Sequence, residues 1–262
     1  PVSGIDVGKE SIMGNLIKYE WRKQRTSRLL ILASLIISII LMIGGSISES
    51  DVVIGFGVLI ISIAGMFSVF YLGIESLIVY NRDLRTKQSY MLFMVPHSTW
   101  EILGAKFISA ILQMFFAAVA FLIGMAACFS VIAVYETSIG ELMRAIWEFI
   151  GRTPEFNWIP LLQALLLLFI VWATVIMTGF LAVTLSRTVL LKSKFAGLIS
   201  VVLFFVISGV TERIHIFLIN LRNVTAQGIL SQISFFDYAF YILICMILFF
   251  ASGWIADRKL SI

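Results

Sequence analysis

Six apolar stretches dominate the sequence, and each is close to the length of a membrane-spanning helix. About 20 apolar residues in a helix are needed to cross the hydrocarbon layer of a bilayer. Backbone groups in that layer must be hydrogen-bonded internally, which makes a helix the natural structure for such a stretch. We therefore predict an all-α polytopic protein forming one transmembrane domain over residues 1–262. Its six spans are expected near residues 29–47, 52–80, 107–135, 159–186, 195–210 and 236–256.

The composition and the charge distribution agree with this class. Of the residues, 60% are hydrophobic and 13% are charged, whereas a soluble domain has about 25% charged residues. With the N-terminus in the cytoplasm, 15 of the 19 Lys and Arg residues fall on the cytoplasmic side. This asymmetry is the positive-inside pattern, which places both termini of a multi-pass cell-membrane protein in the cytoplasm. The basic charge thus reflects topology, and we expect no nucleic-acid partner.

Cysteine labelling tests this topology in a background that lacks Cys128 and Cys245. Single cysteines at Ser89 and Ser193 are expected to be shielded from an impermeant thiol reagent in intact cells. Cysteines at Ser138 and Thr225 are expected to react, because these positions fall in outer segments of the predicted topology. Labelling at Ser89 from outside would overturn the assignment.

The segments that flank the spans contain further helical patterns. Before the first span, Leu16, Ile17 and Trp21 recur at helical spacing among basic residues. This predicts an interfacial helix over 13–28 that rests on the lipid bilayer; an ordinary basic flank is the alternative. Residues 1–12 differ in composition from the rest, and we expect them to be an upstream extension before Met13.

Two outer segments also carry apolar helical patterns. Residues 136–158 predict a second interfacial helix. Residues 211–235 are too polar to cross and too apolar for a free loop, so we expect one or two short helices before the sixth span. These either dip into the outer leaflet or rest on its surface.

Small residues mark one face of the second predicted span. Gly57, Gly65 and Gly73 recur at eight-residue spacing, and small residues allow helices to approach closely in membranes. The stripe predicts either a helix contact within the bundle or a seam between two copies.

The sequence lacks the motifs of common membrane enzymes and ATPases. No GxxxxGK[ST] loop occurs, and His97 and His215 are predicted on opposite sides of the membrane. We therefore expect no catalytic residues, no metal and no bound cofactor. Glu75 is an acid within the second predicted span; it either pairs structurally with Arg82 or forms a functional polar link to the following loop.

The loop 81–106 holds the least expected pattern. Six consecutive apolar residues at 90–95 precede Pro96. At about 100° per residue they point in every direction of a helix, so a membrane surface covers only some of them. A protein partner, or the ends of the bundle itself, must cover the rest. Ser98 and Glu101 then form a capping box for the third span. The predicted contact residues are Tyr90, Met91, Leu92, Phe93, Met94, Val95 and Pro96.

These features together resemble the ABC-2 type permeases of ATP-binding cassette exporters. The resemblance is carried by Glu75, the basic loop 82–87, the apolar run ending in Pro96, Glu-Ile-Leu at 101–103 followed by Lys106, and six spans with both ends inside. The chain departs from the family at 97–99, where His-Ser-Thr stands in place of a pattern ending in Arg.

The resemblance implies a transport subunit that is powered from outside. It implies a coupling helix in the loop 81–106 that docks on a separate ATPase, where ATP and magnesium are bound. It also implies a second permease copy or a similar permease as partner. Gln113, Gln163, Thr174 and Thr178 among aliphatic residues suit an amphipathic or hydrophobic cargo such as a peptide, a lipid or a drug-like molecule. The rivals are a non-transporting scaffold or toxin-immunity protein and a stand-alone secondary carrier.

Overall fold

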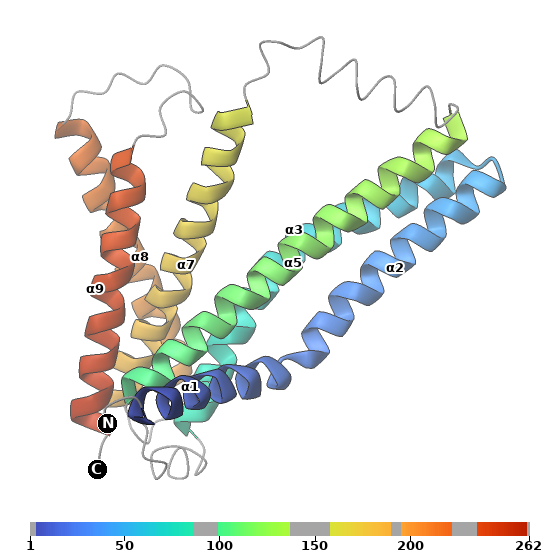
Figure 1. Cartoon of the computed structure of the whole chain (residues 1–262). Coiled ribbons are helices and arrows are strands. Elements are labelled where there is room, and N and C mark those ends of the chain that lie inside the picture. The colour runs from blue at the N-terminus through green and yellow to red at the C-terminus, as the bar shows by residue number, and fades with distance from the viewer. Residues whose placement is uncertain (1–3, 86–98, 137–157, 190–194, 222–234, 261–262) are drawn as a thin grey trace. The chain divides into compact units, whose positions relative to one another are not determined.

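A computed structural model of the chain describes residues 4–85, 99–136, 158–189, 195–221 and 235–260. The regular elements in these ranges are all helices, and six of them are long and apolar enough to cross a membrane. The predicted all-α polytopic fold is thereby confirmed. The helices are α1 (Gly4–Lys23), α2 (Arg25–Ile47), α3 (Asp51–Arg85), α5 (Thr99–Glu136), α7 (Trp158–Val189), α8 (Ala196–Leu221) and α9 (Phe235–Leu260) (Figure 1).

The chain forms two compact units that share two helices. Unit 1 contains α1, α2, α3 as far as Ile74 and α5 from Ser109 onward. Unit 2 contains the remaining parts of α3 and α5 together with α7, α8 and α9. Both α3 and α5 are continuous helices through the boundary.

Unit 1 is built on an antiparallel α2–α3 pair joined by a tight turn. Glu49 adopts the left-handed conformation there, with φ of 49°. The buried core consists of Ile31, Leu35, Met42, Ile61, Leu72, Ala117 and Cys128, from α2, α3 and α5. A Cβ added at Gly57 would lie 2.4 Å from Cγ of Met42, and the Ser38 hydroxyl donates to the Gly57 carbonyl. Gly57 thus allows α2 and α3 to approach closely within unit 1. At this glycine the interpretation as a helix contact within the bundle applies.

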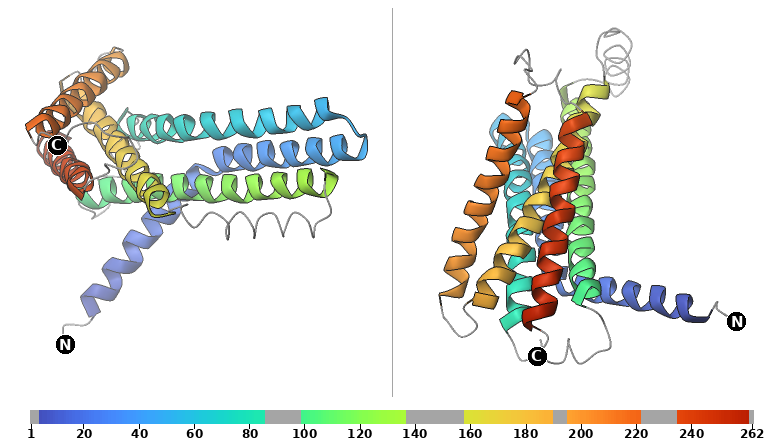
Figure 2. Two further views of the ribbon diagram at one scale, coloured as in Figure 1. Left: turned by 90° about the horizontal axis from the view of Figure 1, so that it is seen from above. Right: turned by 90° about the vertical axis from the view of Figure 1, so that its left-hand side faces the viewer.

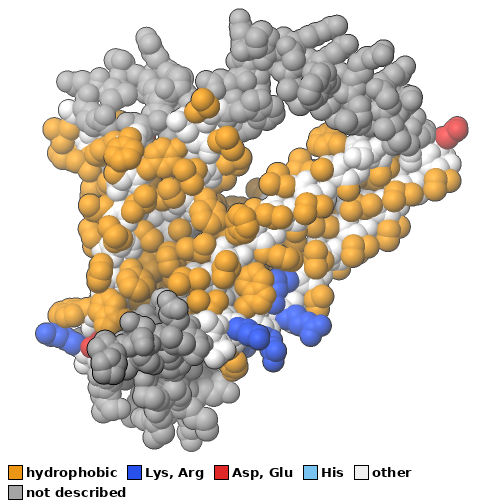
Figure 3. All heavy atoms as spheres, viewed as in Figure 1, with side chains coloured by type: hydrophobic (Ala, Val, Ile, Leu, Met, Phe, Trp, Pro, Cys, Tyr) orange, Lys and Arg blue, Asp and Glu red, His pale blue; other side chains and the backbone are white. Residues whose placement is uncertain are grey.

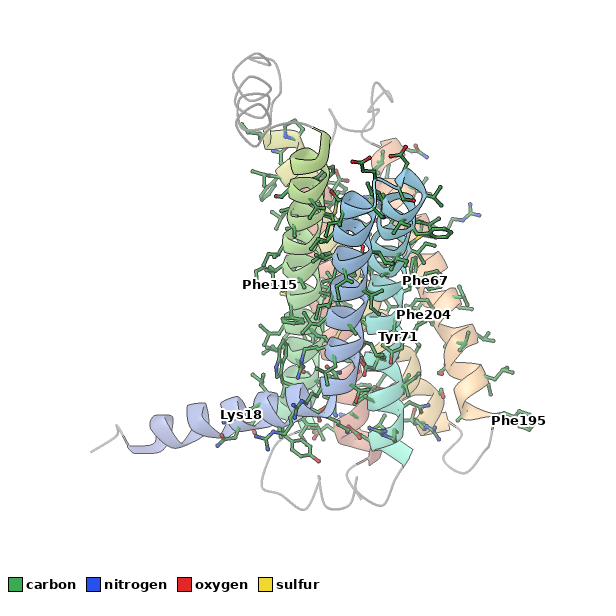
Figure 4. All side chains as sticks on the ribbon, turned by 90° about the vertical axis from the view of Figure 1, so that its right-hand side faces the viewer. Lys18, Phe67, Tyr71, Phe115, Phe195 and Phe204 are labelled. Carbon is green, nitrogen blue, oxygen red and sulfur yellow. The ribbon has the colours of Figure 1, made fainter. Side chains whose placement is uncertain are left out.

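The N-terminal helix differs from its predicted bounds. The chain leaves the helical conformation at Gln24, with φ of −96° and ψ of 21°, so residues 25–28 belong to α2. Figures 2 and 4 show α1 running at a steep angle to α2, with Lys18 on α1. Trp21 fixes this corner because its ring packs edge-on against Phe116 of α5, and the Arg28 guanidinium lies 4.1 Å from the ring centroid. The helix also extends back to Gly4, through part of the predicted extension.

Unit 2 is organised around α7, which packs against both α8 and α9. Figure 2 shows these three helices side by side. The buried side chains of α7 include Ile176, Met177 and Phe180. A Cβ added at Gly179 would lie 2.3 Å from Leu77 of α3, so a small residue is required where these two helices meet. Hydrophobic side chains cover much of the visible surface between the helix ends (Figure 3), as a bilayer environment requires.

Two predicted boundaries are wrong. The fifth span was expected to end at Val210, but α8 continues to Leu221, so residues 211–221 form no separate short helix. Polar residues are tolerated there because a helix satisfies its own backbone groups. Helix α3 continues to Arg85, so the start of the predicted loop 81–106 is helical. Helix α5 begins at Thr99, where the capping box at Ser98 and Glu101 predicts a helix start. The predicted outer helix at 136–158 and the interior of that loop lie outside the described residues.

Candidate functional site

The most polar buried region of unit 2 lies where α3 ends and α5 begins. Lys106 of α5 forms an ion pair with Asp83 of α3, and their side chains are only 5% and 10% exposed. Desolvating two charges costs several kcal/mol per ion unless they stay paired, so each of these side chains depends on the other. The pair therefore ties the last turn of α3 to the second turn of α5.

A second contact joins the start of α5 to the end of α9. The Thr99 hydroxyl donates a hydrogen bond of 2.9 Å to Asp257 Oδ1. Next to it, the Trp100 ring lies against Phe249 and Phe250, with centroid distances of 5.9 Å and 5.8 Å. A Cβ added at Gly253 would lie 2.4 Å from the Trp100 ring. The first residues of α5 are thus held by both polar and apolar contacts.

Two further contacts connect α3 with α7 and α9. The hydroxyl oxygens of Tyr80 and Thr184 lie 2.7 Å apart, and those of Thr184 and Ser252 lie 3.3 Å apart. All three side chains are buried. The Arg187 guanidinium donates two hydrogen bonds to Asn81 Oδ1, at 2.8 Å and 2.6 Å. Four sets of polar contacts therefore link α3, α5, α7 and α9.

We call this group the polar clamp. Its members are Tyr80, Asn81, Asp83, Thr99, Lys106, Thr184, Arg187, Ser252 and Asp257. The space beside Asp83 and Lys106 measures about 20 Å³, room for one water molecule but not for a substrate. Among the described residues, no group of three His, Cys, Asp or Glu side chains could hold a metal ion. The arrangement suits holding helices together rather than chemistry on a ligand.

The sequence-predicted site residues are distributed unevenly. The contact residues Tyr90 to Pro96 lie outside the described residues, but the two helix ends that flank them belong to the polar clamp. Glu75 is half-buried and Arg82 is exposed on α3, and each has contacts in the structure. The ion pair found here joins Asp83 and Lys106, and sequence analysis missed this pairing.

The four predicted pathway residues are divided between the two units. Gln113 is buried in the part of α5 that belongs to unit 1, while the other three lie on α7 in unit 2. Thr174 and Thr178 are buried and donate to backbone carbonyls, Thr174 also to that of Tyr241 on α9. Gln163 is exposed, and its carbonyl accepts a hydrogen bond from Tyr238. A role in lining a path stays a prediction.

The spanning helices contain more acids than Glu75. Asp83, Glu212 and Asp237 all lie within helices long enough to span. On α8, His215 Nε2 lies 3.1 Å from Asp237 Oδ1 of α9, and its Nδ1 lies 3.3 Å from the Tyr241 hydroxyl. The ring also stacks on Phe240 at 4.8 Å. His215 therefore links α8 to α9 inside unit 2 instead of standing in an outer loop.

Comparison of the chain with models of protein families, with curated proteins and with solved structures gives no match.

Proposed function

We propose that the chain is the membrane-spanning permease subunit of an ABC-type exporter. A separate ATPase docks on residues 90–96, and its nucleotide-driven motion moves α3 and α5. The cargo is amphipathic or hydrophobic, and both chain termini lie in the cytoplasm. A second copy of the chain, or a similar permease, completes the transporter.

The observation that carries this proposal is the polar clamp. Residues 86–98 connect the end of α3 to the start of α5, and the clamp ties these two helix ends to each other and to α7 and α9. A displacement of the segment 86–98 is therefore passed to four helices together, which is what a mechanical input into a permease requires. A loop attached to unlinked helix ends would move without transmitting force.

The sequence supports an external source of energy. The chain has no recognisable phosphate-binding loop, and the polar clamp offers no space for a nucleotide. A partner that binds ATP and magnesium would supply the work. A non-transporting scaffold would not need the apolar run at 90–95. It would also not need the end of α3 and the start of α5 to be linked to each other.

The first test is biochemical. The purified chain is expected to show no ATP hydrolysis by itself, and an ATPase subunit is expected to co-purify with it from its native source. Nucleotide hydrolysis is measured before and after removal of that subunit. Robust hydrolysis that survives further purification of the chain alone would count decisively against the proposal.

A second candidate function is a stand-alone secondary carrier. The contact between His215 and Asp237 favours it, because ionisable groups within membrane helices commonly form proton pathways. Transport assays in vesicles separate the two functions. An exporter requires ATP and its ATPase, whereas a carrier moves cargo under a pH gradient without either.

A further inference from the structure

Helix α8 presents a largely uncovered face within unit 2. Among its described residues only Ala196 and Ser200 are buried; α7 packs against the helix, and His215 contacts α9. Figure 2 (right) shows α8 at one edge of the unit. On the uncovered face runs an open groove lined by Phe205, Val206, Gly209, Val210, Arg213, Ile214 and Phe217. Phe205 and Phe217, toward its two ends, are 68% and 64% exposed.

The floor of the groove admits a close neighbour. A Cβ added at Gly209 would meet no heavy atom within 4 Å, so this glycine is not required by packing inside the chain. The space beside Gly57, by contrast, is filled by the side chain of Met42. Small residues at a membrane helix surface are typical of sites where a second helix approaches. Gly209 is therefore the better candidate for an intermolecular contact.

Two exposed charges of opposite sign flank this glycine. Glu212 and Arg213 are both exposed, and within the described part of the chain neither forms an ion pair. Charged side chains in a membrane helix are costly unless they reach the interface or a partner. At 3.6 residues per turn, Arg213 lies about 40° to one side of Gly209, and Glu212 lies about 60° to the other.

We propose that this face of α8 pairs with α8 of a second copy of the chain. When two parallel helices pack about a two-fold axis, one flank of each seam faces the opposite flank of the partner, as in the e and g positions of a coiled coil. Arg213 of each copy then meets Glu212 of the other, on either side of the contact at Gly209. Two equivalent ion pairs result, and the surface is complementary to itself.

Charge complementarity favours a second copy over a lipid. The phosphate of an anionic phospholipid would satisfy Arg213 but would be repelled by Glu212, so one charge would stay uncompensated. The inference rests on the proposed function in one respect: it takes the α8 face as the surface through which two permease copies pair. Its test uses the purified chain alone, so loss of ATPase binding and loss of pairing are distinguishable.

Charge reversal in lipid vesicles provides the test. Energy transfer between differently labelled copies is measured as protein is diluted in neutral lipid. Glu212→Arg and Arg213→Glu are each expected to weaken pairing by roughly tenfold or more, and the double exchange is expected to restore it. Gly209→Leu should also weaken pairing, because it fills the contact. Gly197→Leu is the matched control: its Cβ also meets open space, but it lies about 120° from Gly209 around α8.

The outcomes separate the possible partners. Restoration by the double exchange, with Gly197→Leu unchanged, supports the two-fold contact. Pairing that is insensitive to both single reversals overturns it. A chain that stays monomeric, and retains labelled phosphatidylglycerol unless Arg213 is reversed, also overturns it and assigns the groove to lipid. Helix content and thermal stability in detergent verify that each variant is folded.

Discussion

Replacement of Lys106 by methionine is expected to lower the free energy of unfolding by about 3–5 kcal/mol, because it leaves the Asp83 carboxylate buried without its counter-charge. The two side chains are 5% and 10% exposed, so water does not replace the lost partner. Neutral interhelical hydrogen bonds in membrane proteins contribute on average about 0.6 kcal/mol each. The ion pair thus outweighs any one of the other contacts in the polar clamp. Denaturant unfolding in detergent, followed by helix content, measures the loss.

A double variant separates pairing from packing. Lys106→Met combined with Asp83→Leu removes both charges, and a buried ion pair replaced by apolar groups of similar volume is often neutral or stabilising. We expect the double variant to recover most of the stability lost by the single one. Lys18→Met is the control, because Lys18 is exposed on α1. If the double variant is destabilised as much as the sum of its two single variants, the two charges are not coupled.

The helices were predictable because their signal is local. An apolar run of about 20 residues specifies a span without reference to its neighbours, so all six spans could be located from the sequence. The fifth was predicted too short because Glu212 and Arg213 interrupt the apolar run. The free-energy cost of placing these two charges in a membrane helix depends on which groups surround them in the folded chain. In the structure the helix continues, and the next polar residue, His215, contacts Asp237 of α9.

The polar clamp could not be predicted because its partners are distant in sequence. Asp83 and Lys106 are separated by the whole segment between α3 and α5, and Thr99 and Asp257 lie on the third and sixth spanning helices. Sequence analysis instead considered Glu75 and Arg82, which are close to each other in the sequence. Closeness in sequence does not show whether such a pair forms in preference to one between residues on different helices. Lys106 entered the sequence analysis only as one of the residues that carry the family resemblance, and its partner Asp83 was not singled out.

The replacement of Phe93 by aspartate is expected to abolish export while the permease still folds and inserts. Residue 93 lies outside every predicted span and outside the described residues, so the prediction rests on the apolar run at 90–95. If this run binds in a groove of the ATPase, truncating a central aromatic side chain typically costs about 2 kcal/mol or more of binding free energy. The introduced carboxylate would also be desolvated without a partner, which adds a further penalty. Pull-down of the ATPase and transport in vesicles measure the two losses.

Two controls distinguish the possible failures of this variant. Ile146→Asp places the same carboxylate in the predicted outer segment and is expected to leave ATPase binding intact. Thermal stability in detergent shows whether Phe93→Asp still folds. Full ATPase association and export by Phe93→Asp would show that the run has no coupling role. Unfolding of the permease would instead assign the run to packing beneath the bundle, against the helix ends that the polar clamp holds together.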